Sequence, residues 1–234
     1  MTQEYEQFLI NNDYDGMMDW AFAYDDARSS RKELKKVAEA YEILISKGYG
    51  IAANNLGSMY YCGRYFEEDV DMAIHYYEIA CEMGVKMAWG NLGCCYYYGK
   101  KKDLKKAYEI FAEGAFLFND PECLYMLGDM YRDGSYVKKS DIKMMHLYCK
   151  ALDCVNEEDR REHQCLGDIH YRIGKQLVES ANKEDILQGL KHLHVGIGIL
   201  YERLHENRFV DADIRKYKQL IEETEQMLES EYEA

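Results

Sequence analysis

The chain has 234 residues, which is enough for one large domain or two small ones with a sizeable core. Hydrophobic residues make up 47% and aromatic residues 13%, which excludes a disordered chain, and the single proline, Pro121, fits long helical segments. The formal charge of −14 argues against nucleic acid as a partner, because an acidic surface repels phosphate backbones.

The N-terminal segment, residues 1–11, carries Tyr5, Phe8 and Leu9 but neither a basic start nor an apolar run. It therefore does not read as a secretory signal. Because an array of repeats exposes an apolar face at each end, we predict that this segment forms a short cap over the repeats that follow.

An internal repeat follows, over residues 12–204. The dipeptide Leu-Gly recurs four times, with its glycine at positions 57, 93, 128 and 167, so the spacings are 36, 35 and 39 residues. A degenerate earlier copy keeps the register, with Trp20-Ala21 in place of Leu56-Gly57. The sequence thus predicts five units, at about 12–48, 49–84, 85–119, 120–157 and 158–204.

Each unit is predicted to contain two helices. Six residues after the Leu-Gly glycine, a second glycine at position 63, 99 or 134 marks a turn, and in the last copy it is shifted by one place to Gly174. Aspartates then precede an apolar-periodic run, which is typical of a helix N-cap. These aspartates are Asp69, Asp103, Asp141 and Asp185. We expect helix A, a glycine-marked turn and an Asp-capped helix B.

Helix A has two distinct faces when it is drawn at 100° per residue. One face is mostly apolar and is predicted to be buried: Ala52, Leu56, Met59 and Tyr60 in the second unit, and Ala88, Leu92, Cys95 and Tyr96 in the third. The opposite arc is rich in tyrosine, asparagine and charged residues, which suit contacts with a protein or peptide. The alternative is that some of these tyrosines only pack between neighbouring helices.

The candidate partner-binding residues on this arc are Asn54, Asn55, Ser58, Tyr61, Tyr97, Tyr98, Tyr125, Asp129, Arg132, Asp168, Tyr171 and Arg172.

The pattern A-x3-LG-x2-Y-x2-G followed by D-x3-A resembles the Sel-1-like repeat, a relative of the tetratricopeptide repeat. The second unit carries it as Ala52, Leu56, Gly57, Tyr60 and Gly63, followed by Asp69, Ala73, Ala80 and Gly84. The third unit matches nearly as well, whereas later units depart from it: Cys123 and Glu162 replace the first alanine, and Met145 and Gly189 the later one.

The resemblance implies an all-α, right-handed superhelical solenoid of αα-hairpins, with helices A on the concave side. It also implies an adaptor or scaffold without catalytic residues. A secreted branch of this family joins successive repeats by disulfides, but Cys81 would need a partner at position 89, which is Trp89. We therefore expect a cytoplasmic protein whose eight cysteines are reduced.

The C-terminal segment, residues 205–234, is predicted to be a capping helix followed by an acidic tail. Apolar residues keep a helical spacing after Asp211 and Asp213, from Ile214 to Leu228. The alternative is an amphipathic helix for a membrane or a partner, but the glutamates on its polar face would repel anionic lipids. No stretch of the chain approaches the ~18–20 apolar residues that span a bilayer.

No motif for catalysis, a metal or a cofactor is found. Adjacent cysteines such as Cys94-Cys95 point about 100° apart on a helix and grip one metal poorly. We expect no cofactor, no metal and no enzymatic activity. The alternative is an unrecognised active site in residues 135–165, where the repeat is loosest and where the reactive side chains are His146, Cys149, Cys154 and His163.

The sequence predicts a scaffold or adaptor, monomeric, that holds a protein or peptide on the concave face. The charge favours a basic partner, although it could equally serve only solubility. A narrower alternative is an immunity-type or inhibitor protein that neutralises a toxin or enzyme with a basic surface.

Overall fold

The computed structural model describes residues 2–26, 28–100, 102–156, 165–204 and 210–232. In these ranges the regular secondary structure is helical and no strand occurs, which confirms the all-α prediction. The helices divide into two units, Met1–Cys123 and Leu124–Ala234, and each is described by itself. Among the described residues, no helix is both long enough and apolar enough to cross a bilayer.

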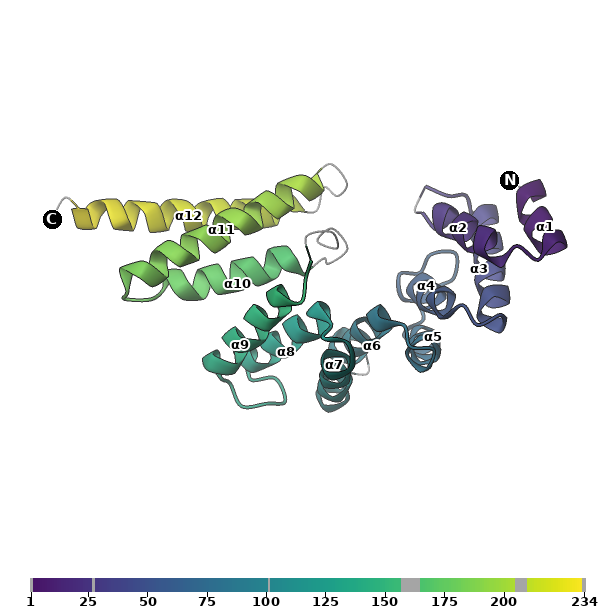
Figure 1. The fold of residues 1–234 in the computed structure, drawn as a ribbon, viewed down its shortest axis with the longest axis horizontal. Helices are drawn as coiled ribbons and strands as arrows, with labels where there is room; N and C mark the ends of the chain where they lie inside the picture. The colour runs from purple at the N-terminus through teal and green to yellow at the C-terminus, as the bar shows by residue number, and fades with distance from the viewer. Residues whose placement is uncertain (1, 27, 101, 157–164, 205–209, 233–234) are drawn as a thin grey trace. The chain divides into compact units, whose positions relative to one another are not determined.

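Unit 1 is an array in which each helix packs against its neighbours in sequence (Figure 1). Contacts join α2 to α3, α4 to α5 and α6 to α7, and further contacts join successive pairs through α3–α4 and α5–α6. The helices are α1 (Thr2–Asn11), α2 (Tyr14–Tyr24), α3 (Arg31–Ser46), α4 (Gly50–Tyr61), α5 (Val70–Glu82), α6 (Lys86–Tyr98) and α7 (Leu104–Phe118).

Unit 2 continues the alternation of helices. It contains most of α8 (Pro121–Asp133), followed by α9 (Asp141–Asp153), α10 (Leu166–Val178), α11 (Lys183–Leu204) and α12 (Asp211–Tyr232). Helix α11 lies between α10 and α12 and contacts both (Figure 1). The number of five repeats, the right-handed superhelix and the capping roles of α1 and α12 stay predictions.

The Leu-Gly glycines have a steric role. In three of the sequence repeats an aromatic ring of helix B lies directly against the glycine of helix A: Tyr77 against Gly57, Phe111 against Gly93, and Tyr148 against Gly128. A methyl group at Gly93 would lie 2.6 Å from Cδ1 of Phe111, closer than van der Waals contact allows. Glycine is therefore required where the two helices approach through an aromatic side chain.

The predicted N-caps are correct for two aspartates and wrong for two. Asp69 and Asp103 each accept a backbone N–H from the first turn of the following helix. In α9 the cap is instead Ser140, so Asp141 is the first helical residue, and Asp185 lies inside the first turn of α11. Their carboxylates lie near the positive end of the helix dipole and not at the cap itself.

The predicted turn at Gly174 is wrong, because this residue lies inside α10. A methyl group there would be 3.0 Å from the carbonyl oxygen of Gly189 in α11, and one at Gly189 would be 2.9 Å from the carbonyl oxygen of Gly174. The two glycines thus allow the backbones of α10 and α11 to approach closely, which explains why neither position accepts a side chain.

Candidate functional site

The structure divides the twelve candidate residues between the two units. Unit 1 carries Asn54, Asn55, Ser58 and Tyr61 on α4 and Tyr97 and Tyr98 on α6, and unit 2 carries Tyr125, Asp129 and Arg132 on α8 and Asp168, Tyr171 and Arg172 on α10. That these residues bind a partner stays a prediction, and their surroundings are described one unit at a time.

A chain of hydrogen-bonded polar side chains crosses the helices of unit 1. The Asn91 amide donates to Oδ1 of Asn54 at 2.8 Å, and the Asn54 amide donates to Oδ1 of Asn55 at 3.3 Å. The Asn55 amide donates to the Tyr41 hydroxyl at 3.4 Å, which in turn donates to Asp25 at 3.3 Å. Side chains from α6, α4 and α3 thus hold one another in fixed orientations up to the end of α2.

An ion pair between Asp25 and Arg64 terminates this series of hydrogen bonds. Nε of Arg64 lies 3.1 Å from Oδ1 of Asp25, whose side chain is 8% exposed, and the same guanidinium donates to the Ser58 hydroxyl at 3.3 Å. Burial raises the pKa of Asp25, and the charge of Arg64 opposes that rise. Burial likewise raises the pKa of Tyr41, with a further contribution from the Asp25 charge, so its hydroxyl remains a neutral donor.

Several residues of this network were not among the sequence candidates. Asn91 occupies the position of Asn55 one repeat later, two residues before the Leu-Gly glycine, so the repeat register could have identified it. Asp25 and Arg64 lie beyond the ends of α2 and α4, where helical periodicity carries no signal.

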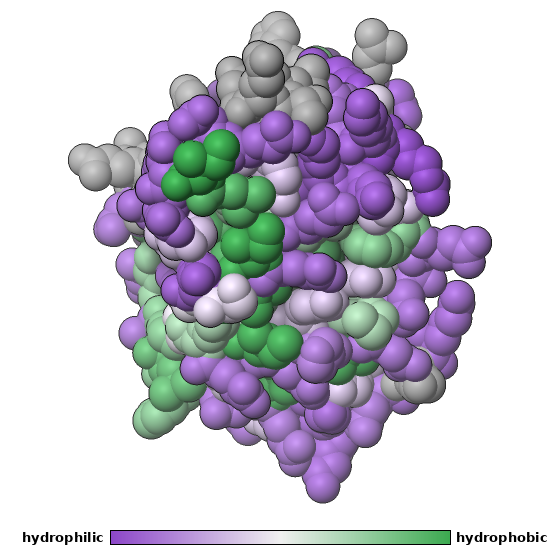
Figure 2. Space-filling view, turned by 90° about the vertical axis from the view of Figure 1, so that its right-hand side faces the viewer, coloured by the Kyte–Doolittle hydropathy of each residue, from purple (hydrophilic) through white to green (hydrophobic). Residues whose placement is uncertain are grey.

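Large apolar side chains on α4 and α6 accompany the polar chain. Ile51 is 52% exposed, Met87 is 55% exposed and Tyr98 is 62% exposed. The hydrogen bond between Asn91 and Asn54 places α6 beside α4 at this point. On the side of the molecule shown in Figure 2, the surface is mostly hydrophilic and the hydrophobic side chains gather in a band. We call Ile51, Asn55, Ser58, Met87 and Tyr98 the unit-1 face.

Two of the candidate residues in unit 1 are buried. Tyr97 is 9% exposed, with its ring centroid 6.5 Å from that of Phe111, and the Lys102 ammonium lies 5.3 Å from the Tyr97 centroid. Asn54 is 4% exposed, and both ends of its amide are engaged by neighbouring asparagines. These two side chains contact residues of the exposed surface from the buried side: Tyr97 packs against Tyr98, and Asn54 donates to Asn55.

A buried carboxylate organises unit 2. Asp129 accepts hydrogen bonds from the Tyr148 hydroxyl, from Arg132 and, at 3.3 Å, from Nε of Arg172. Its side chain is only 8% exposed, whereas those of Arg132 and Arg172 are 28% and 29% exposed. Arg132 also grips Asp133 through two contacts of 2.7 Å. Asp129 therefore links α8, α9 and α10 and is engaged within the fold.

The other candidates in unit 2 differ in their surroundings. The Tyr125 ring lies 6.0 Å from the Tyr148 ring, and burial raises the pKa of Tyr125. The Tyr171 ring lies 5.1 Å from that of Tyr217 in α12. Asp168 is exposed.

The residues of the alternative active site do not form a described cluster. His146 and Cys149 are exposed on α9, Cys154 ends that helix, and His163 lies outside the described residues. Within the described ranges, no group of three or more His, Cys, Asp or Glu side chains is placed to hold a metal ion.

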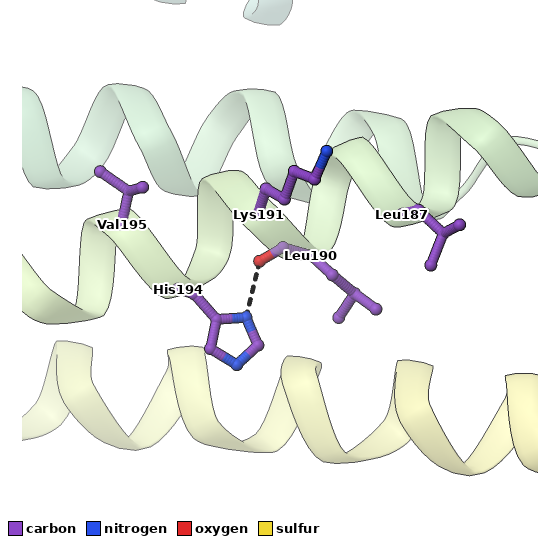
Figure 3. Close-up of a pocket in the computed structure, with 5 residues that line it drawn as sticks. All are labelled: Leu187, Leu190, Lys191, His194 and Val195. Carbon is purple, nitrogen blue, oxygen red and sulfur yellow. Dashed lines mark hydrogen bonds between the residues drawn. The ribbon is translucent and has the colours of Figure 1, made fainter.

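An open apolar depression lies along α11 (Figure 3). Its lining residues all come from this one helix: Leu187, Leu190, Lys191, His194 and Val195. The imidazole Nδ1 of His194 is hydrogen-bonded to the carbonyl oxygen of Leu190 at 2.8 Å, so this ring is engaged by its own helix. These five residues do not supply the converging polar groups that a catalytic site needs.

Two imidazoles meet between α10 and α11. Nδ1 of His170 lies 3.1 Å from Nδ1 of His192, so one ring donates and the other must accept through an unprotonated nitrogen. Burial lowers the pKa of His192. Protonation of the accepting nitrogen would break the hydrogen bond between the two imidazoles.

Because burial lowers the pKa of His192, we predict that the free energy of unfolding depends on pH. The unfolded chain protonates this residue near its ordinary pKa of about 6.5, whereas the folded protein resists protonation until a lower pH. The free energy of unfolding should therefore fall as the pH drops below about 6.5. Urea unfolding at pH 7.5 and 5.5 should show a smaller pH-dependent loss in His192→Gln than in the parent. The control His194→Gln, on the exposed side of α11, should keep the parent's loss; equal losses in all three proteins would contradict the prediction.

Comparison with known proteins gives the following similarities. The Sel1 repeat family matches residues 50–85, 91–115 and 121–155. No significant match to a curated protein was found. Among solved structures, a Sel1 repeat protein from Oxalobacter formigenes is similar, with 20% identity over 80% of this chain and 74% of that chain and a TM-score of 0.62.

Two further structures share the fold. The protective antigen c5321 of uropathogenic Escherichia coli, which displays an SLR fold, has 19% identity over 85% of this chain but only 44% of that chain, with a TM-score of 0.59. The immunity protein Pa5087 from Pseudomonas aeruginosa has 20% identity over 80% of this chain and 66% of that chain, with a TM-score of 0.55. At such identities the likeness concerns the fold alone.

Proposed function

Because this chain carries Sel1 repeats in an all-helical solenoid, we propose that it binds a protein partner through the unit-1 face. Sel1 repeats generally mediate contacts between proteins, and proteins built from them are generally not enzymes. Solenoids suit this role because their repeated helices form extended surfaces. A cytoplasmic location and a monomeric state remain part of the proposal.

The carrying observation is the combination of fixed polar groups and exposed apolar side chains on α4 and α6. The amides from Asn91 to Asn55 are held by one another, so little side-chain entropy would be lost on binding. Ile51, Met87 and Tyr98 expose half or more of their surface, and covering them removes apolar area from water. Tyrosine and methionine are both enriched at interfaces, and methionine adapts to irregular partners.

The charge of the chain bears on the kind of partner. At −14 the protein creates a negative potential that attracts a basic surface and accelerates encounter at low salt. We therefore propose a basic protein or peptide as the partner of the unit-1 face. Binding to it should weaken as the salt concentration rises.

The test is capture of the partner from native extract at low and high salt, followed by identification and titration of the captured protein. We expect Met87→Ala/Tyr98→Ala to lower affinity at least about tenfold, because exposed interface anchors of this kind typically contribute more than 1 kcal/mol each. The matched control is Phe116→Ala/Leu117→Ala, which removes two exposed apolar side chains from α7, a helix B. Tyr97 is left intact because its ring is buried.

The two variants distinguish binding at the unit-1 face from binding elsewhere on the protein. Loss in the α6 variant with retention in the α7 variant, at unchanged helicity, supports the unit-1 face. Equal affinity in the parent and the α6 variant would show that the partner binds elsewhere.

A second candidate is an immunity-type protein, and two observations favour it: the fold shared with the immunity protein Pa5087 and the charge of −14. In this case the partner would be a toxin or enzyme whose basic surface is blocked on mixing. The test is inhibition of a toxin encoded beside this chain at equimolar concentration. Full toxin activity in the presence of excess protein would exclude this candidate for that toxin.

A further inference from the structure

Two loops of the chain follow the same backbone path. They join α4 to α5 and α8 to α9, and they read GRYFEED at 63–69 and GSYVKKS at 134–140. In each loop the first glycine and the tyrosine have positive φ: +66° and +69° in the first, +69° and +67° in the second. Their backbone hydrogen bonds also correspond, since the N–H of Asp69 donates to Tyr60 and that of Ser140 donates to Tyr131, each at 3.0 Å.

A tyrosine with positive φ carries backbone strain, because its Cβ crowds the chain in this conformation. In the α4–α5 loop the ring of Tyr65 is used within the fold. It packs edge-on against Phe66 at 4.7 Å, and the Arg31 guanidinium lies 5.3 Å from its centroid. In the α8–α9 loop, Val137 replaces the phenylalanine and Tyr136 is 52% exposed. The strained position is thus occupied by a tyrosine that is about half exposed.

The charges of the two loops are opposite at equivalent positions. Glu67 and Glu68 in the first loop correspond to Lys138 and Lys139 in the second, and all four side chains are exposed. Glu68 lies 3.6 Å from Lys100. Since the same backbone accommodates either sign, the fold does not dictate the lysines.

The start of α9 adds a further cation and an apolar side chain, beside the exposed carboxylate of Asp141. Lys143 is exposed, with its ammonium 4.8 Å from the Tyr131 centroid, and Ile142 is 85% exposed at the start of α9. The nearby carboxylate of Asp133 accepts two hydrogen bonds from Arg132, and this pairing lowers the pKa of Asp133. Its negative charge is therefore balanced by the positive charge of the arginine. We call Tyr136, Lys138, Lys139, Ile142 and Lys143 the α8–α9 patch.

We propose that the α8–α9 patch docks an acidic protein segment that carries apolar residues. Its lysines would contact carboxylates, and Tyr136 and Ile142 would cover the apolar side chains. The net charge of −14 does not prevent this, because charges farther away than the Debye length of about 8 Å at physiological salt are largely screened. The site lies within unit 2 and is distinct from the unit-1 face.

The probe is a fluorescently labelled oligoglutamate peptide with two central leucines, and its oligolysine counterpart is the comparison. Fluorescence anisotropy should show binding of the acidic peptide only, lost near 1 M salt, where the Debye length is about 3 Å. Lys138→Glu/Lys139→Glu installs the charges that the α4–α5 loop already carries and should lower affinity at least about tenfold. The control Lys32→Glu/Lys35→Glu makes the same change in net charge on exposed residues of α3 and should bind as the parent does.

Tyr136→Gly separates binding from folding. Glycine adopts the positive φ without strain, so the unfolding midpoint should stay the same or rise, whereas the affinity for the peptide should fall several-fold. A tyrosine retained only for structure would give the reverse: a lower midpoint and unchanged affinity.

Three results would overturn the proposal: no preference of the parent for the acidic peptide, parent-like binding by Lys138→Glu/Lys139→Glu, or charge-sensitive binding to phosphatidylserine vesicles without binding to the peptide. Met87→Ala/Tyr98→Ala should bind the acidic peptide as the parent does. The experiments therefore test separately whether the unit-1 face binds a partner and whether the α8–α9 patch binds the acidic peptide.

Discussion

Asp129→Ala should destabilise unit 2 by about 3 kcal/mol, the lower end of the cost of breaking a buried ion pair, since the two arginines remain partly exposed. The substitution removes the acceptor shared by Tyr148, Arg132 and Arg172. Two guanidinium groups and a buried hydroxyl would then face one another without a carboxylate between them. Urea unfolding followed by circular dichroism should show a clearly lower midpoint.

The control for this prediction is Asp133→Ala. Asp133 is also paired with Arg132, but its side chain is 42% exposed and water can replace it. A surface ion pair contributes about 0–1 kcal/mol, so this variant should unfold close to the parent. If both variants lost equal stability, the burial of Asp129 would not be the cause. If Asp129→Ala unfolded like the parent, the network would not stabilise the protein.

Gly93→Ala should destabilise unit 1 by about 2 kcal/mol, a typical cost of overpacking a tight contact. Alanine is the better helix former by about 1 kcal/mol, so helix propensity alone predicts the opposite sign. The added methyl would lie 2.6 Å from Cδ1 and 2.8 Å from Cζ of Phe111, which is fully buried and has little room to move. Thermal unfolding should show a lower midpoint.

Two further variants test the steric explanation. Gly198 lies in α11 with no atom within 4 Å of an added methyl, so Gly198→Ala should stabilise the protein slightly, by up to about 1 kcal/mol. Phe111→Leu shortens the clashing ring, and the loss caused by Gly93→Ala should be smaller in that background. A loss of the same size in both backgrounds would mean that the ring is not responsible.

Much of the architecture followed from the repeat alone. The spacing of the Leu-Gly glycines placed helix A and helix B, and the structure has helices in the predicted order, from α2 to α11. The apolar face was correct for Ala52, Leu56 and Met59, which are fully buried, whereas Tyr60, which was assigned to the same face, is only partly buried. These features are local, because a helix of fixed period must bury its apolar side against the next helix in the chain.

The candidate surface was less predictable. A helical wheel assigned Tyr97 and Asp129 to the open arc, yet one ring lies near Phe111 and the other side chain is enclosed by residues of three helices. The wheel gives the direction of a side chain but not what lies opposite to it. That depends on residues 19 to 43 positions away, such as Tyr148 and Arg172, whose reach across the interface is set by tertiary packing.

The sequence by itself determined the class of fold and the register of the repeated glycines and helices, because these follow from short-range periodicity. Only the tertiary structure decided which polar residues support the fold and which remain on the surface. It also revealed that Tyr65 and Tyr136 share a strained conformation, one packed and one exposed. The physical reason is that burial and backbone strain are properties of the neighbours that a residue acquires on folding, and spacing along the chain does not contain them.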